Sequence, residues 1–277
     1  MNRTTMNPAK PPTPEHLQRR RFSRRKLFLT LPALAAGLLA GVAVAAESTT
    51  AEPAPLRVGV SPVFPPMVFK QGKELAGVEV DLARALGAKL GRQVVFVELD
   101  WKDQTEALVA GKTDIIMSSM SMTPARSAVM SFTRPYLRIG QMALVRREDR
   151  NNHPLGLMVP ADAKVAVIKA TTGDFLVQRE FPKTKRKTYA SGEDAARALM
   201  RSSVDFFIAD STLVWYLAGT RAADGLTAVP FVLSEEFLAW GVRRGNDDLV
   251  AAANQFIERA TQDGTLTKIF RRWMAVE

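Results

Sequence analysis

After residue 55, segments in which the apolar residues form short runs alternate with segments in which they recur at helical spacing. Short apolar runs predict strands, and apolar residues at helical spacing predict helices. The predicted strands are 56–60, 93–98, 114–117, 138–146, 164–168, 186–189 and 205–209. The predicted helices are 78–90, 102–110, 173–181, 192–201 and 211–218. Strands that alternate with helices predict an α/β fold with mostly parallel sheets.

One helix-turn-strand segment occurs twice in the chain. EALVAGKTDIIMSS (106–119) aligns without a gap with RALMRSSVDFFIAD (197–210), so that Asp114 matches Asp205 and Ser119 matches Asp210. Any helix-turn-strand unit resembles another to some extent, and one match is weak evidence for duplication. Ligands of open α/β sheets bind at the carboxyl ends of strands. Ser119 and Asp210 are therefore expected to face each other across a cleft between two similar halves.

The first 46 residues have the layout of a secretory signal. A basic stretch ends at Lys26, an apolar run covers 27–46, and small residues suit cleavage after Ala45 or Ala46. The segment SRRKLFL (23–29) resembles a twin-arginine export signal, and an ordinary Sec signal is the alternative. A polar linker, 47–55, follows. We expect export to the periplasm.

The charge distribution removes nucleic acid as an expected partner. The chain of 277 residues carries a formal charge of +10, but eight of its 38 basic residues and one of its 28 acidic residues lie in 1–46. An excess of three basic residues is left for 47–277. The absence of cysteine excludes disulfides and thiolate metal sites. We expect no cofactor and no metal.

The segment MSSMSMTPAR (117–126) contains the candidate chemistry of the first half. On a strand, Ser119 and Ser121 would share one face, and Met120 and Met122 would pack on the other. Thr123 suits a helix N-cap, which places Arg126 in the first turn, where a cation is unfavourable unless an anion binds there. A ligand carboxylate would be such an anion. The alternative is that Arg126 pairs with a surface acid.

The matching segment supplies a candidate of opposite charge. Asp210 follows a predicted strand and would face Arg126, as a zwitterionic ligand requires. Its alternative role is an N-cap of the helix 211–218. ATTG (170–173) follows the strand 164–168 and could complete a carboxylate site or form a simple capped turn.

These motifs resemble the periplasmic solute-binding proteins of polar-amino-acid ABC importers. The resemblance covers roughly 56–273, and its landmarks occur in the family's order. The landmarks are RVGV (57–60), FPP (64–66), GVEVDLA (77–83), SMTPAR (121–126), FTRPY (132–136), ATTG (170–173) and DGT (263–265). Two positions depart from the family: Ser61 stands where many binders of basic amino acids have an acid, and Ala170 replaces a glycine.

The resemblance implies a two-lobed periplasmic-binding-protein-like fold with the ligand cleft at the hinge. Lobe 1 would comprise 54–144 and 239–277, and lobe 2 would comprise 145–238. Arg126 and Thr172 would hold the α-carboxylate of an amino acid. The implied ammonium ligands are Ser119, Ser121 and Asp210, and the residues implied to face the ligand side chain are Ser61, Phe64 and Trp101.

The implied function is binding of an amino acid, or a related small zwitterion, by lobe closure and its delivery to a membrane permease. We expect a monomer without catalytic residues. Two alternatives stay open. One is a dehydratase of the aromatic amino-acid pathway on the same fold, and the other is a ligand-sensing partner of a membrane receptor. The sequence does not identify the amino acid, although Ser61, Phe64 and Trp101 suit an uncharged or partly apolar side chain.

Overall fold

The structure is a computed structural model that describes residues 53–152 and 159–274. These residues all belong to one compact unit, Ala51–Glu277. The predicted signal peptide (1–46) and residues 47–52 of the predicted linker lie outside the described residues. Among the described residues, no helix combines the length and apolar character that crossing a membrane requires.

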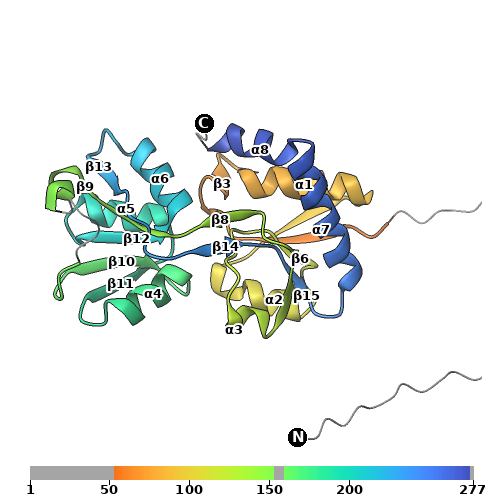
Figure 1. Cartoon of the computed structure of the whole chain (residues 1–277), viewed down its shortest axis with the longest axis horizontal. Coiled ribbons are helices and arrows are strands. Elements are labelled where there is room, and N and C mark those ends of the chain that lie inside the picture. The colour runs from red at the N-terminus through yellow and green to blue at the C-terminus, as the bar shows by residue number, and fades with distance from the viewer. Residues whose placement is uncertain (1–52, 153–158, 275–277) are drawn as a thin grey trace, which may run out of the picture. The chain divides into compact units, whose positions relative to one another are not determined.

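Two five-stranded sheets of one topology form the framework (Figure 1). The first has the order β5-β1-β6-β15-β7, formed by Val94–Glu98, Leu56–Val60, Ile115–Ile116, Gly241–Arg243 and Met130–Phe132. The second has the order β11-β10-β12-β9-β13, formed by Lys185–Tyr189, Lys164–Ile168, Phe206–Asp210, Gln141–Arg146 and Leu226–Val229. In each sheet the first three strands are parallel, and the fourth is antiparallel to both neighbours.

The chain passes between the two groups of elements along a two-stranded antiparallel ribbon. Leu137–Ile139 (β8) leads from the first group to the second, and Glu236–Leu238 (β14) leads back (Figure 1). The strand after each crossing becomes the fourth strand of its new sheet: β9 after β8, and β15 after β14. A smaller sheet of Val63–Phe64 (β2), Val68–Gln71 (β3) and Glu74–Ala76 (β4) follows β1.

Helices cover the sheets. The helices nearest the first sheet in sequence are Val78–Leu90 (α1), Gln104–Val109 (α2), Pro124–Ser127 (α3), Asp247–Gln262 (α7) and Thr265–Trp273 (α8). The second sheet has Thr172–Glu180 (α4), Gly192–Met200 (α5) and Ser211–Thr220 (α6). Two 3-10 helices, Trp101–Asp103 (η1) and Arg147–Asn152 (η2), complete the elements. Because strand side chains alternate, α4 packs on the face of Val165 and Val167, and α5 packs on the face of Ala166 and Ile168.

The two halves repeat a hydrogen-bonded corner at the two aspartates that the sequence alignment matches. Asp114 accepts a hydrogen bond from the backbone N–H of Arg57 at 2.9 Å, and Asp205 accepts one from that of Lys164 at 2.8 Å. Each aspartate also donates its own N–H to the carbonyl of the same partner, at 2.8 Å in both cases. The alignment of Asp114 with Asp205 therefore corresponds to equivalent positions at the start of the third strand.

The predicted strand 138–146 is two strands with different partners. Its first part, β8, pairs with β14, and its second part, β9, pairs with β12 and β13. The chain changes partner at Gly140, where an added Cβ would lie 2.0 Å from the carbonyl oxygen of Ser234. Residues 141–144, which the sequence analysis assigned to the first lobe, are hydrogen-bonded into the second sheet instead.

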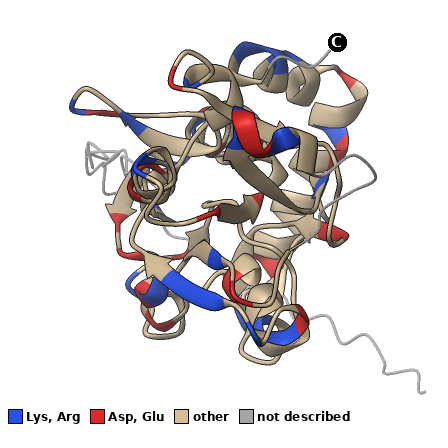
Figure 2. Ribbon diagram, turned by 90° about the vertical axis from the view of Figure 1, so that its left-hand side faces the viewer, with Lys and Arg blue, Asp and Glu red and all other residues tan. Residues whose placement is uncertain are grey.

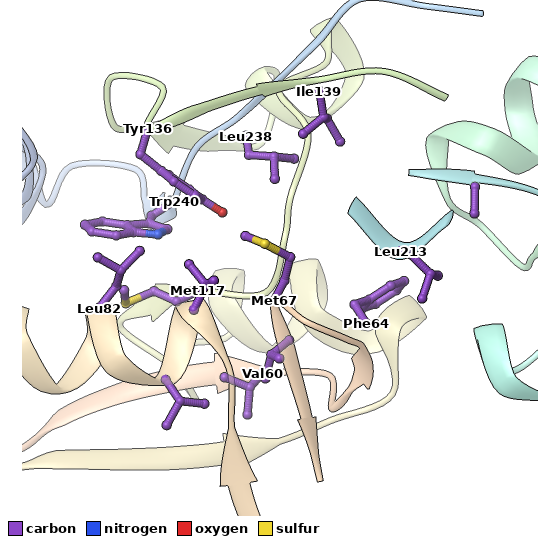
Figure 3. Packing of buried hydrophobic residues seen from close by; sticks show 14 of the residues in the cluster. Val60, Phe64, Met67, Leu82, Met117, Tyr136, Ile139, Leu213, Leu238 and Trp240 are labelled. Atoms are coloured by element: carbon purple, nitrogen blue, oxygen red, sulfur yellow. The ribbon is translucent and has the colours of Figure 1, made fainter. Parts of the chain in front are cut away.

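Buried side chains from both halves pack together beside the ribbon (Figure 3). Phe64 of the first group lies near Leu213 of α6, and Tyr136 and Trp240 lie together at the first-sheet end of the crossing strands, beside the pair Leu137 and Leu238 (Figure 3). The rings of Tyr136 and Trp240 lie 5.5 Å apart. Basic and acidic segments are interspersed with each other in Figure 2.

Candidate ligand-binding site

A small cavity lies between the carboxyl ends of strands from the two sheets. Its lining residues are Phe64, Trp101, Ser119, Ser121, Arg126, Thr171, Thr172 and Asp210. Seven of the eight predicted site residues are therefore brought to one place, and Thr171 joins them. The cavity holds about 10 Å³, enough for about one water molecule. A larger ligand requires its walls to move apart.

The segment after β6 departs from the predicted strand. The strand ends at Ile116, and Ser119 has a left-handed backbone with φ 57°. Ser119 and Ser121 both line the cavity, but the simple alternation of a strand does not bring them there. Met120 is buried as predicted, whereas Met122 is 38% exposed and does not pack.

The Ser119 hydroxyl is a buried group without a partner. Its Oγ has no hydrogen bond, although the side chain is 95% buried. Its backbone N–H donates to Glu79 Oε1 at 2.7 Å, which holds the left-handed turn in place. A buried polar atom without a partner is costly in free energy. The Ser119 hydroxyl is therefore available to a ligand in the cavity.

Both the backbone and the side chain of Arg126 are held by neighbouring residues. Thr123 caps α3 by accepting the Arg126 N–H, and Pro124 occupies the first helical position, as predicted. The guanidinium donates from Nη1 to the Ser121 carbonyl at 2.8 Å and lies 5.1 Å from the centre of the Trp101 ring. Burial lowers the pKa of Arg126, and the charges of Asp210 and Glu236 oppose this. The four-residue α3 is too short to contribute a sizeable dipole. The Arg126 guanidinium therefore interacts with the Ser121 carbonyl, the Trp101 ring and the charges of Asp210 and Glu236.

Asp210 presents the opposite charge from the second sheet. It occupies the N-cap position of α6, as the alternative predicted, but its side chain makes no cap hydrogen bond, so the carboxylate does not serve the helix. Gln141 Nε2 lies 2.7 Å from Asp210 Oδ1 and 3.2 Å from Thr172 Oγ1. Burial and the neighbouring Glu236 carboxylate raise the pKa of Asp210 to about 7. Asp210 is thus half ionised near neutral pH.

Gln141 and Glu236 belong to the site and were missed by the sequence analysis. Glu236 lies on the returning strand β14, where it accepts from the Ser121 hydroxyl at 2.6 Å and from Gln141 Nε2 at 3.0 Å. Gly173 leaves room for Gln141, because an added Cβ would lie 2.5 Å from Gln141 Oε1. Neither residue belongs to a sequence motif. Only their positions where the chain crosses between the sheets could have indicated a role in the site.

Glu79 supports the site from beneath. This fully buried carboxylate accepts hydrogen bonds from the Tyr136 hydroxyl at 2.6 Å and from Trp240 Nε1 at 3.0 Å, in addition to the Ser119 N–H. Burial raises its pKa, and the three hydrogen bonds oppose the shift. Glu79 therefore joins the cavity wall to the first-sheet end of the crossing strands.

Two aromatic residues close one end of the cavity, and Ser61 stands outside it. Phe64 and Trp101 pack edge to face with ring centres 5.2 Å apart. Ser61 is buried, donates to the Leu99 carbonyl at 2.8 Å and accepts from Gln104 Nε2 at 3.0 Å. It lines a second, larger cavity on the other side of Trp101. The structure does not bring Ser61 to the Arg126–Asp210 cavity.

No residues for a metal are gathered anywhere in 53–152 or 159–274. These ranges contain no group of three or more histidine, cysteine, aspartate or glutamate residues that could hold a metal ion. The site offers a guanidinium, carboxylates, hydroxyls and aromatic faces instead. Such groups recognise a small molecule that carries both charges.

Two sheets of one topology, joined by two crossing strands and contributing opposite charges to one cavity, define a two-lobed binding protein of the periplasmic-binding-protein-like fold. The family comparison agrees. The chain belongs to the bacterial extracellular solute-binding proteins, family 3, whose model matches residues 56–276.

Individual relatives are similar over most of their length. ABC transporter arginine-binding protein 1 of Escherichia coli (strain K12) is 26% identical over 253 residues, which is 88% of this chain and 98% of that protein. The L-cystine-binding protein TcyJ of the same strain is 25% identical over 228 residues, covering 80% and 83%. The crystal structure of an ancestral amino acid-binding protein, described as a precursor of cyclohexadienyl dehydratase, is 31% identical. It has a TM-score of 0.71 and covers 79% of this chain and 94% of that one.

Proposed function

We propose that the protein binds an amino acid, or a related small zwitterion, outside the cytoplasm and delivers it to the permease of an ABC importer. The observation that carries this proposal is that Arg126 and Asp210, of opposite charge and from different sheets, line one cavity together with hydroxyl groups. The relatives named above bind arginine and L-cystine, and both support the same ligand class.

Each side chain has a role in this proposal. Arg126 and Thr172 hold the ligand carboxylate, since a guanidinium can make two parallel hydrogen bonds to it. Asp210, Ser119 and Ser121 hold the ammonium group. Phe64 and Trp101 face the ligand side chain. Glu236 is not a ligand here, because its oxygens already accept from Ser121, Gln141 and Ser234.

Binding takes place by hinged closure of two lobes. Lobe 1 contains the first sheet and lobe 2 the second, with the hinge at β8 and β14 rather than at 143–144. The small volume of the cavity supports this mechanism, because a ligand can enter only when the lobes separate. The mature protein is proposed to be a periplasmic monomer that a signal peptide at 1–46 exports.

The test is isothermal calorimetry with the full set of amino acids. We expect at least one to bind with micromolar or better affinity. The variant Arg126→Ala should weaken binding by about 10- to 150-fold, because a charged hydrogen bond contributes about 1.5–3 kcal/mol. Arg134→Ala is the matched control, since Arg134 pairs with Glu258 on the surface. Unchanged binding in Arg126→Ala would remove Arg126 from the site.

The same site is proposed to act without catalysis. The raised pKa of Asp210 is a property that an acid catalyst would also need, so the dehydratase alternative has one observation in its favour. Incubation of the purified protein with prephenate and arogenate decides between them. Turnover that disappears in Asp210→Asn would establish the enzyme, and binding without turnover supports the transport function.

A further inference from the structure

The Trp101 indole makes a direct hydrogen bond between the two halves of the protein. Trp101 begins η1 after β5 of the first sheet, and its Nε1 donates to the carbonyl of Ala170 at 3.0 Å. Ala170 follows β10 of the second sheet. The two residues are 69 positions apart in the chain, so this bond forms only when the strand ends of both sheets face each other.

Both partners of this bond are held in position by other contacts. The Trp101 ring packs against Phe64 on its edge and lies under the guanidinium of Arg126. Ala170 has a left-handed backbone with φ 62°, which is unfavourable for alanine. Its N–H donates to Asp174 Oδ2 at 2.9 Å, and the N–H of Thr171, which shares a peptide group with the Ala170 carbonyl, donates to the Ile168 carbonyl at 3.3 Å. The bond therefore needs no rearrangement on either side.

Trp101 also separates two cavities. On one side lies the small cavity of Arg126 and Asp210. On the other lies a cavity of about 540 Å³ whose lining includes Pro62, Leu99, Ile168 and Tyr189. Trp101 is the residue that lines both. The residues on either side of Ala170 line different cavities, Lys169 the larger and Thr171 the small one, so the Trp101–Ala170 hydrogen bond lies where the two linings meet.

We propose that the Trp101–Ala170 hydrogen bond is a latch that closes the side-chain end of the ligand site and selects amino acids with short side chains. This inference rests on the proposed function for its ligand class. A short side chain leaves the latch closed, and the bound state keeps its hydrogen bond. A long side chain separates Trp101 from Ala170. The hydrogen bond between the indole N–H and the Ala170 carbonyl is then broken, and binding weakens.

The test compares Trp101→Phe with the wild type against alanine and methionine, two uncharged ligands of different length. Phenylalanine keeps an aromatic ring and removes the N–H. We expect the wild type to bind alanine more tightly than methionine. The ratio of alanine affinity to methionine affinity should fall about 3- to 10-fold in the variant, since only the alanine complex loses the latch, whereas the smaller ring affects both ligands. Calorimetry measures both dissociation constants.

Trp273→Phe is the matched control. Its indole donates to Asp81 Oδ2 at 2.8 Å, far from the cavity residues in sequence and outside their lining, so it loses an equivalent bond without touching the site. Its ratio of alanine to methionine affinity should equal that of the wild type. A wild type that prefers methionine, or a Trp101→Phe variant that weakens both ligands equally or neither, would overturn the selectivity.

A second measurement tests the latch without any ligand. The chain has no cysteine, so Lys112→Cys and Lys183→Cys, one exposed residue in each half, can be spin-labelled specifically. We expect Trp101→Phe to add a population with a longer label distance. An unchanged distance distribution would overturn the latch. Failure of the wild type to bind any amino acid would instead refute the proposed function and leave this distance measurement to decide on the latch.

Discussion

At the scale of single residues, Asp210 lies where a ligand ammonium group would need a carboxylate, in surroundings that oppose ionisation of that carboxylate. Its carboxyl group is buried, and the nearest charges are the Glu236 carboxylate, which opposes ionisation, and the Arg126 guanidinium, which favours it. The pKa of about 7, against 3.8 for an ordinary aspartate, means that the folded protein holds this proton more tightly than the unfolded chain. The contribution of Asp210 to stability is therefore present at low pH and is lost as the pH rises from about 4 to 7.

Ligand affinity should depend on pH for the same reason. An ammonium group binds the ionised carboxylate, so the dissociation constant should fall about tenfold between pH 6 and pH 8 if only the ionised form binds. Calorimetry at several pH values measures this slope. Asp210→Asn should remove the slope and most of the affinity, whereas Asp205→Asn, at the other end of the same strand, should keep both. A flat profile in the wild type would contradict the role of Asp210.

At the scale of elements, the corner at Asp114 has stronger charged contacts than the equivalent corner at Asp205. Burial alone would raise the pKa of Asp114, but hydrogen bonds from the Arg57 N–H and guanidinium, together with the charges of Arg57 and Arg92, lower it. Asp205 keeps the backbone bond to Lys164, but its side chain is 40% exposed and lies 3.9 Å from Arg146. The first corner therefore depends more on charge than the second.

Asp114→Asn should cost about 1–3 kcal/mol of unfolding free energy at pH 7, because it weakens charged hydrogen bonds. Asp205→Asn should cost less than about 1 kcal/mol. Since the pKa of Asp114 is lowered on folding, its contribution is present above pH 3.8 and is lost as the pH falls through the folded value. Urea unfolding at pH 7 and at successively lower pH measures both variants. Equal costs would show that the corners are alike.

At the scale of the whole molecule, two features join the halves in addition to the chain crossings. Buried residues of both sheets belong to one hydrophobic cluster, in which Phe64 and Leu213 lie near each other (Figure 3). The hydrogen bond from Trp101 Nε1 to the Ala170 carbonyl connects η1 of the first half to the segment after β10 of the second. We therefore expect the halves to unfold together and not in separate steps.

Thermal unfolding with and without ligand checks this expectation. A ligand at 100 times its dissociation constant adds about 2.7 kcal/mol to the stability of the folded state. For a unit of this size that corresponds to a rise in Tm of about 5–10 °C. Differential scanning calorimetry should show one transition that shifts as a whole in the wild type and shifts by about half as much or less in Arg126→Ala at the same ligand concentration. Two transitions of which one shifts would indicate independent halves.

The sequence alone determined the local features of this protein, because they depend on neighbouring residues. Apolar spacing predicted most strands and helices, Thr123 and Pro124 predicted the start of α3, and the internal match assigned Asp114 and Asp205 to equivalent positions of the two halves. The predictions that failed depended on partners instead. Periodicity could not show that the chain changes sheets at Gly140, or that Ser119 turns left-handed because Glu79 accepts its N–H.

Only the tertiary structure decided how the site is assembled. Gln141 and Glu236 are 95 positions apart and carry no motif, yet they meet beside Asp210 because the chain crosses between the sheets twice. Trp101 and Ala170 each looked like a local feature, and their hydrogen bond exists only across the two halves. Local patterns determine which elements form, but contacts between distant segments depend on how those elements pack, and packing decides which of the candidate residues face one cavity.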